Sequence, residues 1–390
     1  MNLKKNIFLY YVVTFFSAFI FLIPIWSFFF VNYLHFSFWW ALFITILSGW
    51  VSFIFEIPSW AWADRFGRKR TYILGLIFIL FWFSFYLWAD SIIWFLVAWI
   101  FEWIWFAMTS WNLESLIHDN LIENKTEKAF KNISAHSYVY GFIWRGLSSL
   151  VAGYLFVIDP LLPVFFTIGA YFIVLILLFF ITESEYHKPE KTTNLKHIKA
   201  TFQFVFEHKV IYIFFILMFF QSGLGNVYWF TYQPYLKSIW FDIWFIGIIF
   251  AILSFISAFW SYILKRLQDK FETIFIVKII LYAIGLSALF FYFVDNKLWL
   301  IPVVLLAITS GFVMPLWNNF LSSQVSSSKK STLLSIFSFV ITLWYFSFSI
   351  LAWFLVDIIW LKQLYLWVLL LCVLLFLVDI LYFRKLKFRE

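Results

Sequence analysis

The sequence alternates between long apolar stretches and short polar segments. A helix needs about 20 mostly apolar residues to cross the hydrocarbon core of a bilayer. Twelve stretches meet this requirement, at residues 7–31, 38–60, 72–89, 92–117, 134–157, 161–182, 210–234, 241–264, 273–294, 298–322, 332–358 and 363–383. Backbone polar groups cannot stay unpaired in lipid, and these stretches are too long and continuous for barrel strands. We therefore predict an all-α membrane protein with twelve transmembrane helices.

The positive charges predict the orientation of these helices. When the N-terminus is placed in the cytoplasm, 23 of the 28 Lys and Arg residues fall in inner segments. The outer loops then hold only Lys237, Lys297 and Lys362, while Arg145 and Lys278 lie within predicted spans. Cytoplasmic loops of membrane proteins carry such an excess of Lys and Arg. We therefore expect both termini to be cytoplasmic.

The longest polar segment divides the chain into two halves of six predicted helices each. We expect an N-terminal half over residues 1–182, a cytoplasmic linker over 183–209 and a C-terminal half over 210–390. Within the linker, apolar residues recur at helical spacing opposite two lysines, which predicts an amphipathic helix on the inner membrane surface. The alternative is a plain solvated linker.

The two halves resemble each other in sequence. Residues 152–155 match residues 352–355 in helices five and eleven, and residues 105–112 match 311–318 in helices four and ten. Together these matches indicate two pseudo-symmetric six-helix repeats related by an axis along the membrane normal.

Composition excludes several classes of protein. Hydrophobic residues make up 64% of the 390 residues and charged residues 12%, and the mean hydropathy is +0.93. Soluble domains average nearer ~45–50% apolar and ~25% charged. A soluble enzyme, a nucleic-acid-binding domain and a disordered protein are therefore excluded, and the net charge of +8 indicates topology and attraction to anionic lipid. The single Cys372 and the six scattered His residues predict no disulfide, metal site or cofactor.

The basic start of the chain has two interpretations. It is basic and then apolar, as a signal peptide is. The apolar run over residues 7–31 is longer than the ~7–15 residues of a signal peptide and has no small-residue cleavage site. We therefore interpret it as a retained first helix.

The loop after the second predicted helix carries a motif. Residues 56–70 read E-I-P-S-W-A-W-A-D-R-F-G-R-K-R. This resembles the cytoplasmic loop signature of the major facilitator superfamily, roughly G-x-x-x-D-R-x-G-R-[RK]. The matching residues are Asp64, Arg65, Gly67, Arg68 and Lys69. Trp60 stands where the family has Gly.

The resemblance covers the whole chain and implies the fold of that superfamily. It also implies that the loop is a cytoplasmic gate that latches the two halves together. Asp64 could pair with a neighbouring Arg or face a helix N-terminus, and we expect Glu56, Glu114 and Asp119 to be gate partners. The alternative is that the loop is only a positive-inside anchor.

Polar residues inside the predicted spans are candidates for the transport path. Charged groups at helix centres cost at least ~2.5–3.5 kcal/mol on insertion scales. Glu102 and Arg145 both lie near mid-depth, so we expect them to form a pair that responds to protons or substrate; a purely structural ion pair is the alternative. Further candidates for the cavity lining, or for hydrogen bonds between helices, are Gln221, Asn226, Asn318 and Asn319.

The resemblance implies a secondary transporter that works by alternating access in the plasma membrane. We expect a monomeric protein that carries a small organic solute, coupled to protons through Glu102. Export (efflux) is favoured by the resemblance, although helix five lacks the Gly-Pro pair of many proton-driven exporters. The alternative is a non-transporting sensor or chaperone on the same scaffold. An enzyme is not expected, because no side-chain cluster suits catalysis. ATP-driven transport is not expected either, because the polar segments contain no phosphate-binding loop motif.

Tryptophan and glycine occur in unusual amounts. The chain has 24 Trp and only 12 Gly, although Gly averages ~7% of residues and is enriched in transmembrane helices. In the repeat, Trp353 matches Gly153 and Trp105 matches Gly311. The 57 Phe residues indicate an A+T-rich gene, in which UGA is favoured over UGG. Our hypothesis is that many of these Trp positions are UGA codons that the source organism decodes as Gly. Further positions where the resembled family tends to have small residues are Trp103, Trp111, Trp240, Trp260 and Trp344.

Overall fold

The fold is described from a computed structural model of the 390-residue chain. The residues that the structure describes are 3–37, 40, 43, 54–55, 58–59, 62–63, 65–88, 91–109, 112–184, 203, 207, 233, 236, 241–294, 298, 300–324, 363, 365–367, 369–370 and 372–373. All regular elements over these residues are helical, as the apolar stretches predict. The chain forms two compact units, which are described one at a time. The first contains Met1–Asn194 with Phe241–Tyr262, and the second contains Leu195–Trp240 with Ile263–Glu390.

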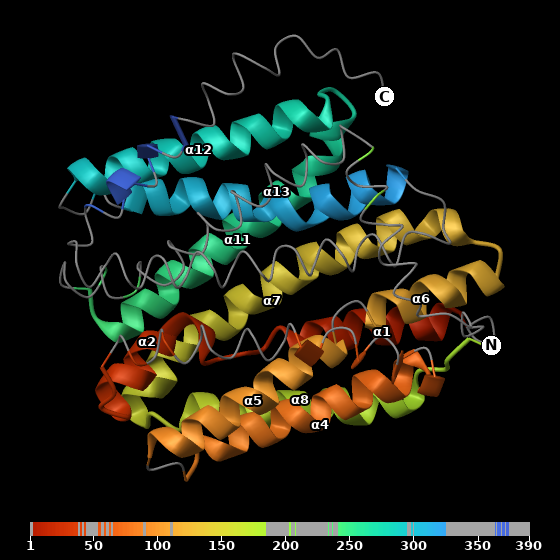
Figure 1. Ribbon diagram of the computed structural model, residues 1–390, viewed down its shortest axis with the longest axis horizontal. Coiled ribbons are helices and arrows are strands. Elements are labelled where there is room, and N and C mark those ends of the chain that lie inside the picture. Colours follow the sequence, from red (N-terminus) through yellow and green to blue (C-terminus); the bar gives the residue numbers. More distant parts are fainter. Residues whose placement is uncertain are drawn as a thin grey trace. The chain divides into compact units, whose positions relative to one another are not determined.

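The first unit contains most of the described long helices (Figure 1). These are α1 (Leu3–Ser17), α4 (Arg68–Phe85), α5 (Ile92–Thr109), α6 (Asn112–Glu123), α7 (Phe130–Ile158), α8 (Leu162–Phe180) and the larger part of α11 (Ile243–Gln268). Short helical elements lie between them at η1 (Ile23–Ile25), α2 (Trp26–Phe28), η2 (Phe29–Tyr33) and η3 (Glu127–Ala129).

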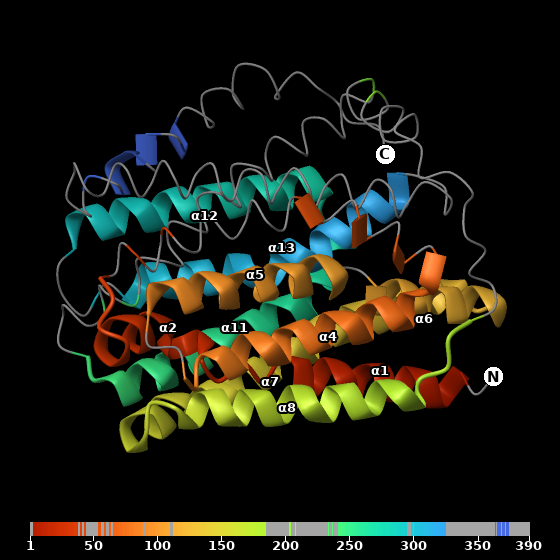
Figure 2. The ribbon, with the colours of Figure 1, turned by 60° about the horizontal axis from the view of Figure 1, so that its bottom comes forward.

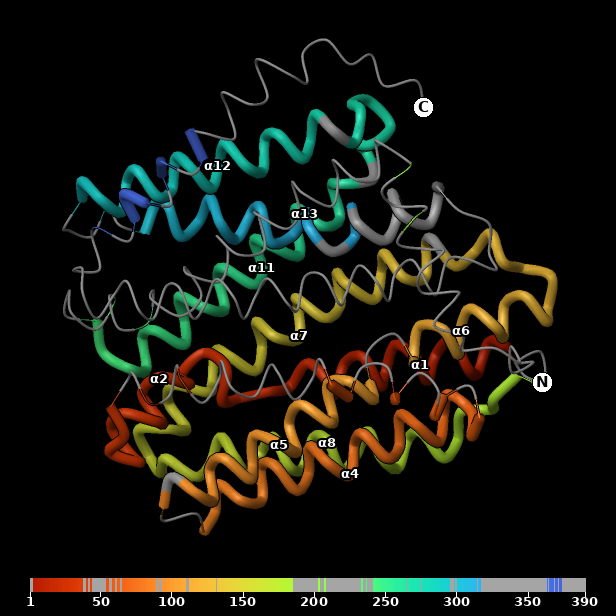
Figure 3. Tube along the Cα trace, viewed as in Figure 1, coloured from red at the N-terminus to blue at the C-terminus, as the bar shows by residue number. Residues whose placement is uncertain are grey.

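Helices that are distant in sequence pack side by side in this unit. Helix α8 lies against both α1 and α4, and α4 also lies along α5 (Figures 2 and 3). The faces between them are closed by fully buried side chains such as Leu76, Phe83 and Val174. Apolar side chains on the outer faces are exposed, as on helices that face lipid. The unit is therefore a helical bundle with an apolar core.

The first predicted helix is interrupted, which corrects the expectation of one continuous helix over residues 7–31. Helix α1 ends at Ser17, and the chain turns before the 3-10 helix η1 and the π-helix η2. Pro24 lies in the first turn of η1. Proline has no N–H to donate, and inside an α-helix its ring would clash with the carbonyl four residues earlier. The helix that begins at Leu3 therefore cannot continue through Pro24 without a break.

The remaining boundaries follow the apolar stretches closely where the structure describes them. The fifth and sixth predicted helices correspond to α7 and α8, and the helical region of the fourth extends to Glu123 rather than to residue 117. Five helices within the described residues are long and apolar enough to cross a membrane. They span Ile93–Glu123, Glu127–Ile158, Leu162–Phe180, Ile243–Gln268 and Phe275–Phe293. Spans two, seven, eleven and twelve fall largely outside the described residues, so the total of twelve stays a prediction.

Two helices of the first unit approach closely through glycines. A Cβ added at Gly153 of α7 would lie 2.7 Å from the backbone carbonyl oxygen of Ile243 in α11. A Cβ added at Gly247 of α11 would lie 2.7 Å from the backbone carbonyl oxygen of Ser149. Helix pairs in membranes use small residues in this way to bring their backbones together.

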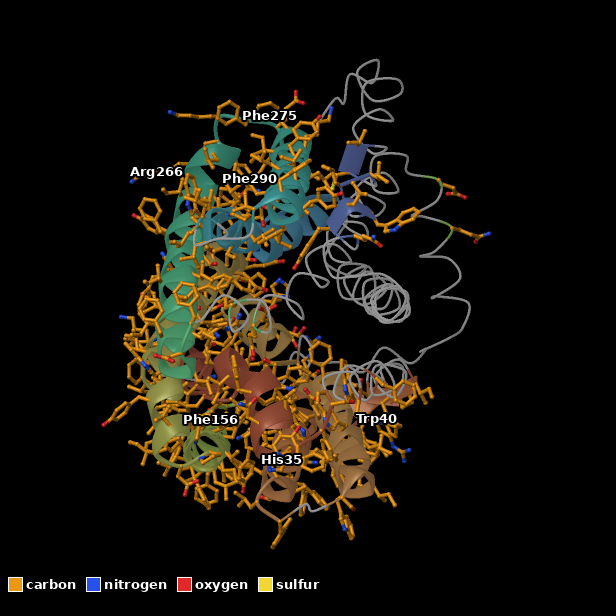
Figure 4. All side chains as sticks on the ribbon, turned by 90° about the vertical axis from the view of Figure 1, so that its left-hand side faces the viewer. His35, Trp40, Phe156, Arg266, Phe275 and Phe290 are labelled. Atoms are coloured by element: carbon orange, nitrogen blue, oxygen red, sulfur yellow. The ribbon has the colours of Figure 1, made fainter. Side chains whose placement is uncertain are left out.

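The second unit includes α12 (Thr273–Phe293) and α13 (Leu300–Gln324). Ser287 of α12 contacts the backbone carbonyl oxygen of Pro302 in α13 at 3.3 Å, and the Phe291 ring stacks on that of Tyr365 at 4.9 Å between centroids. On the outer side of α12, Phe275 is 46% exposed (Figure 4). An exposed aromatic at this position is consistent with a lipid-facing surface.

Candidate transport site

The second half of the loop motif forms a polar cluster at one end of the first unit. Arg68 begins α4, and its Nε lies 3.1 Å from Oδ2 of Asp119 near the end of α6. Both side chains are largely buried, at 19% and 10% exposure. This ion pair ties the start of one helix to the end of another, so Asp119 contacts the motif as the sequence predicts. We call Arg68, Lys69, Asp119 and Glu183 the Arg68 cluster.

Glu183 caps the N-terminus of α4 from the segment that follows α8. Its Oε1 accepts hydrogen bonds from the backbone N–H groups of Arg68 (2.6 Å) and Lys69 (3.1 Å). A carboxylate at a helix N-terminus satisfies free donors and complements the helix dipole. Glu183 is not among the contacts of the motif that the sequence predicts. The only signal is that it is the first acidic residue after the sixth apolar stretch.

Gly67 makes this cap possible. Its φ is +96°, a backbone conformation that side chains disfavour. A Cβ at this position would also lie 2.9 Å from both carboxylate oxygens of Glu183. The glycine of the motif therefore allows the turn and the close approach of the carboxylate.

Lys69 caps the C-terminus of α8, whereas Glu183 caps a helix N-terminus. Its Nζ donates to the backbone carbonyl oxygens of Ile181 (2.7 Å) and Phe179 (3.1 Å), at the C-terminus of α8. Cations stabilise helix C-termini in this way. Burial lowers the pKa of the Lys69 ammonium, and the nearby Glu183 carboxylate opposes this effect. The motif cations thus join α4, α6 and α8 within one unit.

The other predicted gate residues are not part of this cluster. Arg65 lies over the ring of Phe66, with its Cζ 5.3 Å from the centroid. Glu114 interacts electrostatically with the phenols of Tyr10 and Tyr72. Asp64 and Glu56 lie outside the described residues. The predicted latch between the two halves therefore stays a prediction.

Glu102 lies in the middle of α5, inside a span of membrane length. Its Oε2 is buried and has no hydrogen-bond partner within the described part of the chain. The side chains of Tyr86, which caps the C-terminus of α4, and of Tyr171 in α8 lie near it. A buried carboxylate oxygen without a partner costs about 1–3 kcal/mol or more. Such a group is retained in a membrane helix when it serves a function.

Arg145 of α7 lies close to the same region but does not pair directly with Glu102. Its Cζ lies 5.6 Å from the ring centroid of Phe142, and among the described residues no ion pair joins it to Glu102. Tyr171 of α8 lies near both charged groups. The Tyr171 hydroxyl donates to the backbone carbonyl oxygen of Ser17 (3.1 Å). The described residues therefore show no direct pair between Glu102 and Arg145, and the proton- or substrate-responsive role of the two residues stays a prediction.

Two indoles near Glu102 were not among the predicted site residues. Trp99 and Trp105 lie three residues before and after Glu102, so all three residues share one side of α5. The Nε1 atoms of both indoles are buried without a hydrogen-bond partner among the described residues. One side of α5 thus carries one acceptor and two donors that this part of the protein leaves unsatisfied.

The remaining candidates are not tested by the geometry. Gln221 and Asn226 lie outside the described residues. For Asn318 and Asn319 the structure describes only the backbone, which belongs to α13. Within the described residues, no group of His, Cys, Asp and Glu side chains could hold a metal ion.

A bundle that contains five apolar helices of membrane length among the described residues is the architecture of an integral membrane protein. The sequence profile of the Major Facilitator Superfamily matches residues 7–349. The chain therefore belongs to the Major Facilitator Superfamily, a family of secondary transporters, and the sequence-based assignment is confirmed.

Solved structures of transporters share this fold. The structure of the nucleoside transporter NupG has a TM-score of 0.74 at 13% identity, with 100% of each chain covered. A D-xylose-proton symporter has a TM-score of 0.74 at 14% identity, covering 96% of this chain and 97% of the symporter. The human organic anion transporter MFSD10 (TETRAN) has a TM-score of 0.74 at 13% identity, and the match covers 97% of this chain and 99% of that transporter. A sequence comparison with curated proteins finds no match.

Proposed function

We propose that this protein carries a small organic solute across the membrane by alternating access, with Glu102 as its proton-binding group. The observation that carries the proposal is the buried Oε2 of Glu102, which has no hydrogen-bond partner among the described residues. An unsatisfied carboxylate gains a stable state by binding a proton or a substrate donor. Binding of the proton or the substrate donor offsets the free-energy cost of the buried carboxylate. We propose that this couples ligand binding at Glu102 to the conformation of the protein.

Two further observations support this proposal. Tyr171 lies near both Glu102 and Arg145, so a carboxylate and a guanidinium approach the same phenol within the span. One structural neighbour is a D-xylose-proton symporter, so proton coupling occurs on this fold.

The proposal includes the finer architecture. It assumes twelve helices in two six-helix halves, cytoplasmic termini and a monomer in the plasma membrane. The direction we propose is export. The halves would rock about a site near the bilayer midplane, as in other transporters built from repeats.

Transport in proteoliposomes tests this function. A panel of radiolabelled organic solutes is offered with and without an imposed pH gradient, first to the unmodified protein and then to Glu102→Gln. We expect at least one solute to accumulate only with the gradient, and this dependence to disappear in Glu102→Gln. A protein that moves no solute under either condition would instead support a sensor or chaperone role. Equal transport at all pH values in both proteins would exclude Glu102 as the proton site.

A further inference from the structure

The tryptophans of the first unit are accommodated in two different ways. Trp82 donates from Nε1 to the Tyr86 hydroxyl at 2.8 Å, and Trp88, beyond the end of α4, is 74% exposed. The hydrogen bonding of Trp82 and the exposure of Trp88 are ordinary, because buried indoles find a partner and exposed indoles form interfacial belts. Trp105 has neither, since its Nε1 is buried and without a hydrogen-bond partner among the described residues.

Trp105 also lies where two helix backbones come close. A Cβ added at Gly75 of α4 would lie 2.8 Å from Cγ2 of Thr109 and 3.4 Å from the backbone carbonyl oxygen of Trp105. Close crossings in membranes are built from small residues on the facing helices. In the internal repeat, the residue that matches Trp105 is Gly311. The backbone of position 105 therefore lies at a close helix crossing, and its counterpart in the repeat is glycine.

Trp144 of α7 is too close to its neighbour. Its ring centroid lies 3.9 Å from that of Phe15 in α1, whereas aromatic pairs are normally 4.5–7 Å apart. Elsewhere on α7, a glycine allows close packing, since a Cβ at Gly146 would lie 2.7 Å from the Phe255 ring of α11. The short ring distance therefore marks position 144 as an overpacked contact between α7 and α1.

We propose that the native protein carries glycine in place of Trp60, Trp105 and Trp144, because UGA codons at these positions are decoded as glycine. The three positions come from different observations: the signature glycine of the loop motif, the close α4–α5 crossing, and the short ring distance to α1. The composition agrees, because glycine at about 18 of the 24 Trp positions would bring its share close to the ~7% average.

The exchange at position 105 has a consequence for the transport site. The Trp105 ring lies 6.0 Å from that of Tyr171 and 6.4 Å from that of Trp82, between centroids. Glycine there leaves a space beside Glu102 and Tyr171 that a solute can occupy. This consequence rests on the proposed transport function, whereas the identity of the residue does not.

Peptide mass spectrometry of the protein purified from its native membrane tests the proposal. We expect peptides with glycine at positions 60, 105 and 144, and with tryptophan at positions 82 and 88 as the internal control. Tryptophan at positions 105 and 144 would overturn the proposal. The measurement involves no transport, so a solute panel that fails with glycine confirmed would overturn only the proposed function.

Thermal unfolding of recombinant protein gives a second readout. The chain as written is compared with the triple variant Trp60→Gly, Trp105→Gly and Trp144→Gly, both expressed in a host that reads UGG as tryptophan. We expect the triple variant to give more monodisperse protein and a higher Tm, since it removes overpacked rings. The matched control is Trp88→Gly, which removes an exposed ring and should not raise the Tm. A lower yield and Tm for the triple variant would count against the proposal.

Discussion

The Arg68 cluster and the surroundings of Glu102 differ in whether their charged groups have hydrogen-bond or ion-pair partners. In the cluster, each of the four charged side chains contacts an ion partner or a helix end at 2.6–3.1 Å. Around Glu102, one carboxylate oxygen is buried without a hydrogen-bond partner among the described residues. Satisfied charges stabilise a structure, while unsatisfied buried groups cost free energy. The contrast supports a structural role for the first region and is the basis of the transport role proposed for Glu102.

The largest expected effect concerns Glu102. Glu102→Leu should abolish pH-dependent transport and still raise the free energy of unfolding by about 1–3 kcal/mol, because it removes an unsatisfied buried group. Transport assays and thermal unfolding in detergent measure the two effects on the same preparation. A variant that loses stability together with transport would place Glu102 in the same structural class as the Arg68 cluster.

Breaking the ion pair should act in the opposite direction. Asp119→Ala leaves the largely buried Arg68 guanidinium without its carboxylate, and we expect a loss of about 2–3 kcal/mol of stability. The exposed Asp269, just after the end of α11, supplies the control, since Asp269→Ala should change stability by less than about 0.5 kcal/mol. If both variants unfold at the same temperature, the ion pair contributes nothing measurable.

The glycine of the motif should tolerate no side chain. Gly67→Ala forces a Cβ against Glu183 at a φ of +96°, and we expect it to cost about 1–3 kcal/mol. Gly169 of α8 is the matched control, because a Cβ there meets nothing within 4 Å. Gly169→Ala should gain about 0.5–1 kcal/mol from helix propensity. The comparison of the two melting curves separates local strain from a general effect of glycine replacement.

The smallest effect is expected for the helix cap. Glu183→Ala removes the acceptor for two backbone N–H groups and should cost about 1 kcal/mol. Glu183→Gln keeps an acceptor oxygen and should recover part of this loss, because only the charge is removed. Chemical denaturation of the two variants at several salt concentrations measures how much of the cap is electrostatic. A Glu183→Gln variant as unstable as Glu183→Ala would show that the charge alone matters.

The sequence by itself determined the class of this protein. Apolar stretches of membrane length predict helices because lipid offers no partner to a bare backbone, and the loop motif identified the superfamily. The ends of α7, α8 and α12 follow directly from where the apolar residues stop. The interruption of the first helix at Pro24 was readable in principle, since proline cannot continue an α-helix.

Only the tertiary structure decided which side chains meet. The sequence placed Asp119 among three candidate gate partners without showing which of them pairs with Arg68, and it did not indicate Glu183. In the same way, mid-depth positions predicted a pair between Glu102 and Arg145, but no ion pair joins them among the described residues, and Tyr171 of α8 lies near both. Depth in the membrane follows from counting residues, whereas direction around the helix axis depends on packing. For that reason the sequence predicts the charges that matter and the structure decides their partners.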